Sequence, residues 1–79
     1  MAGDKLIALF SEVLNVPADI LSDDSSPEEV PQWNSLAAMN LVSAIEDDFD
    51  VALSTREIII MRTIGKAREV LRSKGVQGV

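Results

Sequence analysis

The chain has 79 residues, of which 47% are hydrophobic and 4% aromatic, and its formal net charge at pH 7 is −6. This length suits one small domain over residues 1–79, and the few aromatic residues favour an aliphatic core built from helices. The chain contains no cysteine and no histidine, which excludes disulfides, thiolate nucleophiles and imidazole bases. We therefore expect no catalytic residues and no metal site.

The charges are unevenly distributed. Residues 1–55 hold eleven acids and one lysine, a net charge of −10, whereas residues 56–79 hold six bases and two acids, a net charge of +4. An acidic main body disfavours nucleic acid and favours partners with basic surfaces. Neither a signal peptide nor a membrane span fits the N-terminal residues, so we expect a cytoplasmic protein.

Apolar residues at intervals of three and four predict a first helix over residues 4–14, with Asp4 as its N-cap. The long connection over residues 15–32 contains Pro17, Pro27 and Pro31. We expect one helical turn near residues 27–30 and a solvated acidic run at Asp19, Asp23 and Asp24. The apolar residues expected to pin this loop to the bundle are Val16, Ile20, Leu21 and Val30.

A second helix is predicted to begin at Asn34 or Ser35 and to end near Phe49. If Asn34 is the N-cap, the Ser35 hydroxyl is free to face solvent. If Ser35 is the cap, its hydroxyl has only a structural role, which is the commoner case. The apolar residues at helical spacing, predicted to hold the bundle, are Leu36, Met39, Val42, Ile45 and Phe49.

Acidic residues close this helix at Glu46, Asp47, Asp48 and Asp50. Negative charge at a helix C-terminus is unfavourable for the helix dipole. A role in partner recognition and a merely solvated face are therefore about equally favoured interpretations of these acidic residues.

Two shorter elements follow. Ser54 and Glu57 match a capping box, which predicts a short helix over residues 55–61, although the β-branched run at 58–60 locally prefers a strand. A lone strand would have no partner, so we predict a helix. Thr63 is expected to cap a last helix to about Ser73, with Gly75 as its terminator and residues 75–79 as a flexible tail.

The pattern is thus an all-α, small four-helix bundle with three longer helices, one short helix and a long loop between the first two. It resembles the acyl carrier proteins over nearly the whole chain. The resemblance is most specific in the loop sequence Asp-Asp-Ser-Ser-Pro-Glu-Glu-Val-Pro-Gln-Trp, in Ser35-Leu36, and in Ile-Glu-Asp-Asp-Phe at 45–49.

The resemblance implies a 4′-phosphopantetheine arm attached covalently to Ser35 by a phosphopantetheinyl transferase that uses coenzyme A. Asn34, as the helix cap beside it, stands where the family usually has aspartate. Acyl groups would be carried on the arm as thioesters, so the chain would be a monomeric carrier and not an enzyme. The cargo would belong to fatty acid, polyketide or related lipid biosynthesis.

The resemblance also implies that the second helix meets basic docking surfaces on acyl-loading and acyl-processing enzymes. The candidate partner-binding residues are Leu36, Met39, Ser43, Glu46, Asp47 and Asp48. Two alternatives stay open at this point. One is a helical-bundle interaction module that carries no arm, and the other is a carrier of aminoacyl cargo.

Overall fold

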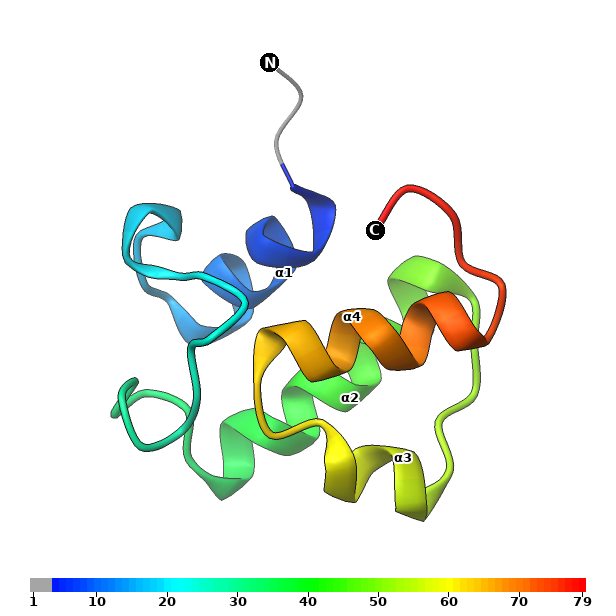
Figure 1. Ribbon diagram of the computed structural model, residues 1–79. Helices are drawn as coiled ribbons and strands as arrows, with labels where there is room; N and C mark the ends of the chain where they lie inside the picture. Colours follow the sequence, from blue (N-terminus) through cyan, green and yellow to red (C-terminus); the bar gives the residue numbers. More distant parts are fainter. Residues whose placement is uncertain (1–3) are drawn as a thin grey trace.

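The structure is a computed structural model that describes residues 4–79, and these residues form four α-helices and one short 3₁₀ helix (Figure 1). The elements are α1 (Lys5–Leu14), η1 (Ala18–Ile20), α2 (Ser35–Phe49), α3 (Thr55–Ile60) and α4 (Ile64–Ser73). The predicted all-α bundle of three longer helices and one short one is confirmed. The 3₁₀ helix η1 was not predicted.

The first helix has the predicted N-cap. The Asp4 carboxylate accepts hydrogen bonds from the backbone N–H groups of Leu6 and Ile7, at 3.0 and 3.2 Å. The helix ends at Asn15, which adopts a left-handed conformation with φ of 58°. Asparagine tolerates this conformation better than most residues, and Pro17 then prevents the helix from resuming.

The core lies where α1 packs against α2 and α4. Trp33, at the end of the long loop, contacts Phe10 edge to face with ring centroids 5.2 Å apart. Such a pair contributes about 0.5–1.5 kcal/mol beyond its buried area. The largest fully buried side chains are Phe10, Leu6, Ile45, Ile64 and Leu71.

The long loop is ordered by its own apolar residues, as predicted for Val16, Leu21 and Val30, which are buried. The prediction for Ile20 was wrong, because 61% of this residue is exposed. It belongs to η1, where the 3₁₀ geometry turns it away from the core while Leu21 points inward. The helical turn expected at 27–30 forms through the N–H groups of Glu29 and Val30, which both donate to the Ser26 carbonyl.

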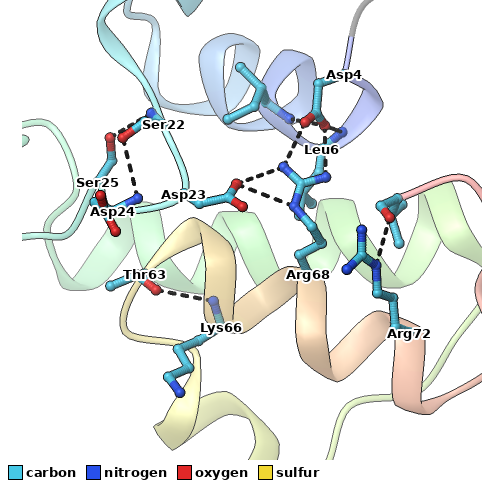
Figure 2. Close-up of polar contacts among 12 residues, drawn as sticks. Asp4, Leu6, Ser22, Asp23, Asp24, Ser25, Thr63, Lys66, Arg68 and Arg72 are labelled. Carbon is cyan, nitrogen blue, oxygen red and sulfur yellow. Dashed lines mark hydrogen bonds and ion pairs between the residues drawn. The ribbon is translucent and has the colours of Figure 1, made fainter.

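Arg68 joins three segments that are far apart in sequence (Figure 2). Arg68 is only 9% exposed, and its guanidinium group contacts the carboxylates of Asp4 and Asp23 at 2.6 and 2.8 Å. The Asp23 carbonyl also accepts a hydrogen bond from Gly65 N–H at 2.9 Å. A Cβ atom at Gly65 would lie 3.0 Å from that carbonyl oxygen, so glycine permits the close approach. Asp19, Asp23 and Asp24 are exposed, as expected of a solvated acidic run, but the pairing of Asp23 with Arg68 was not predicted.

The two last helices have the predicted caps. Ser54 and Glu57 form a complete capping box at α3, and the Thr63 hydroxyl accepts from Lys66 N–H at the start of α4. The helix predicted over the β-branched run is confirmed. Gly75 adopts a φ of 89° just after α4. The predicted flexibility of 75–79 stays a prediction, although Arg72 donates to the Val79 carbonyl at 2.8 Å.

Asp4→Asn should remove the ion pair with Arg68 and keep the cap of α1, because asparagine caps helices as well as aspartate does. Burial alone would raise the pKa of Asp4, but hydrogen bonds from Arg68 and from the first amides of α1 together hold this pKa below 3.8. The carboxylate therefore adds stability at neutral pH, and this contribution is lost as the pH falls below 3.8 toward the folded pKa.

We expect Asp4→Asn to lower the free energy of unfolding by about 1 kcal/mol at neutral pH, because the carboxylate is partly exposed and screened. Urea denaturation at a series of pH values measures this difference, which should shrink in acid. A difference that stays constant with pH would contradict the assignment of this stabilisation to the ionised Asp4 carboxylate.

Candidate functional site

The N-terminus of α2 resolves which residue caps the helix. Asn34 has an extended backbone, its side-chain oxygen accepts from Ala37 N–H at 2.9 Å, and its carbonyl accepts from Ala38 N–H at 2.8 Å. Asn34 is thus the N-cap and Ser35 is the first helical residue. Among the described residues, no hydrogen bond involves the Ser35 hydroxyl, and this residue is exposed. The hydroxyl is consequently available for chemistry.

Ser35 opens onto a groove of about 540 Å³ between α2 and α3. The groove is mainly apolar and has one charged side chain, Arg62, on its wall. Its lining consists of Pro27, Trp33, Asn34, Ser35, Ala38, Ile58, Ile59, Met61 and Arg62. No acidic side chain of residues 4–79 lines this groove, so a negatively charged group on the Ser35 oxygen would share the groove with a cation.

The ion pair of Arg62 with Glu28 is weak. The two side chains are 68% and 69% exposed and lie 3.3 Å apart. The pKa of Glu28 is lowered first by its own backbone amide and by the Ser26 hydroxyl, and only then by Arg62. Exposed pairs of this kind contribute little to stability, so the guanidinium group can exchange Glu28 for another anion.

The start of α2 is also favourable for an anion. The positive end of the helix dipole lies there, and the first N–H groups of a helix lack helical partners. In the described part of the chain, the N–H groups of Ser35 and Leu36 donate no hydrogen bond to protein. A phosphate ester on Ser35 therefore fits both the local charge and the free donors.

An exposed stripe runs along α2 from Ser35 to the acidic end of the helix. Leu36 and Met39 are 71% and 70% exposed, and Ser43 and Asp47 continue the stripe at helical spacing. With a rise of 1.5 Å per residue, Ser35 lies about 20 Å from this acidic end. The stripe thus follows one face of α2 and joins Ser35 to Asp47, whereas Asp48 projects about 100° further around the helix axis.

The acidic residues at this end differ in their surroundings. Asp47 and Asp48 are exposed, but Glu46 is half-buried and its carboxylate accepts a hydrogen bond from Leu53 N–H at 2.8 Å. Glu46 therefore holds the loop between α2 and α3. Asp50 ends the helix in a left-handed conformation with φ of 54°.

The face of α2 that holds the bundle agrees only in part with the predicted one. Ile45 is buried as predicted, and Val42 and Phe49 are half-buried. Leu36 and Met39, also predicted to hold the bundle, are largely exposed, and Leu41 is buried instead. The helical spacing alone does not say which of these apolar residues face inward. The position of α1 decides this.

The contribution of α3 to the site was not predicted from the sequence. Ile58 and Met61 form the wall opposite Ala38, and Ile58 also lines an apolar hollow of about 310 Å³ with Met39 and Val42. The only sequence signal was the isoleucine run, which indicated secondary structure and gave no position relative to Ser35.

Residues 4–70 match the family model described as the phosphopantetheine attachment site. The chain belongs to this family. It is the family of the acyl carrier proteins, and the match covers most of the chain. A comparison with curated proteins found no match.

As a member of this carrier family, the chain bears 4′-phosphopantetheine as a covalently attached group. This group supplies the thiol that a chain without cysteine lacks. The start of α2 fits its phosphate, because it has an exposed hydroxyl and free amides and because Arg62 lines the adjoining groove. None of the helices in residues 4–79 has the length and apolar character needed to span a membrane.

Asn34→Ala should destabilise the carrier by about 1 kcal/mol, because the Ala37 N–H loses its side-chain acceptor. Asn34→Asp should retain most of the stability, since aspartate accepts the same hydrogen bond and its charge suits the helix N-terminus. Urea denaturation of both variants measures the effect. Equal stability of Asn34→Ala and the wild type would contradict the cap assignment.

Proposed function

We propose that this chain is a discrete acyl carrier protein and that Ser35 is the residue to which its phosphopantetheine arm is attached. The observation that carries the proposal is the division of roles at the start of α2. Asn34 supplies the cap, which leaves the Ser35 hydroxyl exposed and without a hydrogen-bond partner. A serine needed only for capping would have its hydroxyl engaged with the backbone.

Attachment is a phosphoryl transfer from coenzyme A, catalysed by the transferase. The Ser35 oxygen forms a bond to the phosphorus next to the pantetheine, the pyrophosphate bond breaks, and adenosine 3′,5′-bisphosphate leaves. The hydroxyl proton passes to a base of the transferase, because no histidine is present in this chain. The free amides of α2 and the guanidinium group of Arg62 then compensate the charge of the phosphodiester.

The exposed stripe of α2 is proposed as the docking face for the transferase and for acyl-loading and acyl-processing enzymes. Leu36, Met39 and Ser43 form its centre, and Asp47 and Asp48 form its charged rim. Apolar centres and charged rims are typical of protein interfaces. Glu46 contributes mainly by fixing the adjacent loop, since its carboxylate is engaged with Leu53 N–H.

The cargo is proposed to be an acyl group of fatty acid, polyketide or related lipid biosynthesis, carried as a thioester on the arm. The apolar lining between α2 and α3 supports acyl rather than aminoacyl cargo, since a charged amino group would lose solvation there. The chain catalyses no step itself. It raises the effective concentration of its cargo at each partner, and we propose that it acts as a cytoplasmic monomer.

Incubation with coenzyme A and a broad-specificity phosphopantetheinyl transferase should add about 340 Da, the mass of phosphopantetheine, to the intact chain. Mass spectrometry measures this addition, and Ser35→Ala should abolish it. Ser73→Ala is a matched control, because Ser73 is an exposed serine that lies in α4, outside the proposed docking face. Protein that is never modified, or an adduct that persists in Ser35→Ala, would overturn the proposal and favour an interaction module without an arm.

Reversal of the charges at Asp47 and Asp48 to lysine should slow association with the transferase by about tenfold at low salt. It should also weaken the salt dependence of the association rate, because the two charges steer the encounter. Stopped-flow measurements over a range of ionic strength give both quantities. Asp19→Lys in η1, also exposed, should have a much smaller effect, and equal effects would contradict a specific docking face.

A further inference from the structure

Helix α3 exposes three consecutive isoleucines. The exposed fractions of Ile58, Ile59 and Ile60 are 38%, 64% and 49%. β-Branched residues are weak helix formers, and this short helix depends on its capping box and on the pair of Glu57 with Lys74 at 2.8 Å. Contiguous exposed apolar residues on a small protein are typical of an interaction surface.

Two of these isoleucines face a groove of about 620 Å³ between α3 and α4. Ile59 and Ile60 form one wall, and Val70 of α4 contributes to the apolar floor. The complete lining is Ile59, Ile60, Arg62, Lys66, Glu69, Val70 and Ser73. Ile59 and Arg62 also line the groove beside Ser35, whereas Ile60, Lys66 and Val70 line the α3–α4 groove and not the one beside Ser35.

The rim of the α3–α4 groove carries Arg62 and Lys66. Lys66 lies 3.7 Å from Glu69, and Arg62 lies 3.3 Å from Glu28, with all four side chains more than half exposed. Such exposed pairs are weak and exchangeable. The charged side chains that line the groove are these two cations and one acid, Glu69.

We propose that the α3–α4 groove binds an acidic amphipathic helix of a partner protein. The isoleucine wall and Val70 would receive the apolar face of that helix, as in other helix-in-groove complexes, and Arg62 and Lys66 would pair with acids along its flank. A basic helix would be less favoured, because Arg62 and Lys66 outnumber Glu69, the one acid among the lining residues. This surface differs in position and in charge from the acidic end of α2, where basic partner surfaces are proposed to dock.

The test uses a synthetic peptide of about four helical turns, with leucines along one face and glutamates beside them. Titration of the ¹⁵N-labelled full chain should give saturable amide shifts in α3 and α4, centred on Ile60, Lys66 and Val70. The same peptide with lysines in place of glutamates should give no saturable shifts there. Added salt should weaken binding of the acidic peptide.

Ile60→Ser and Lys66→Glu should each raise the dissociation constant of the acidic peptide by about tenfold or more. Ile20→Ser is the matched control, because Ile20 is 61% exposed and lies outside the groove. Circular dichroism establishes that each variant keeps its helices. Ser35→Ala should bind the peptide like the wild type, so the result is independent of the proposed attachment site.

The proposal is overturned if the acidic peptide gives no saturable shifts in α3 and α4, or if Ile60→Ser and Lys66→Glu both bind it like the wild type. It is also overturned if the chain dimerises with increasing concentration and Ile60→Ser abolishes the dimer. That result would assign the groove to a second copy of the chain.

Discussion

The contact of Arg68 with Asp4 and Asp23 positions the rest of the structure. It joins the start of α1, the long loop and α4, three segments with few other polar contacts between them (Figure 2). The guanidinium fork suits two carboxylates at once. Because both acids remain partly exposed, the charges avoid the full cost of desolvation. The loop held in this way leads directly to Trp33 and then to the start of α2.

The chemistry at the start of α2 depends on two adjacent residues, one of which caps the helix while the other keeps its hydroxyl free. Asn34 satisfies an amide of the first turn, so Ser35 is left with a free hydroxyl in a region of positive potential. Trp33 anchors the same segment by packing on Phe10. A reactive group is thereby presented by a rigid helix end, while the cofactor itself supplies the thiol and the mobility.

The fold places acidic and basic residues of the chain on different surfaces. Asp47 and Asp48 lie exposed near the C-terminus of α2, whereas the cations Arg62 and Lys66 lie in the α3–α4 connection and in α4. Surfaces of opposite sign on one small domain allow partners of opposite charge to be distinguished. The weak ion pairs of the basic surface leave its cations available for exchange.

Local signals in the sequence determined the helices, their caps at Asp4, Ser54 and Thr63, and the family, because capping and periodicity act over only a few residues. The sequence left open whether Asn34 or Ser35 capped α2. Tertiary packing alone decided which face of α2 is exposed. Helix α1 packs on Leu41 and Ile45 and leaves Leu36 and Met39 outside. The pairing of Arg68 with Asp23 and the placement of α3 beside Ser35 likewise depend on contacts between residues far apart in the chain, which no local pattern specifies.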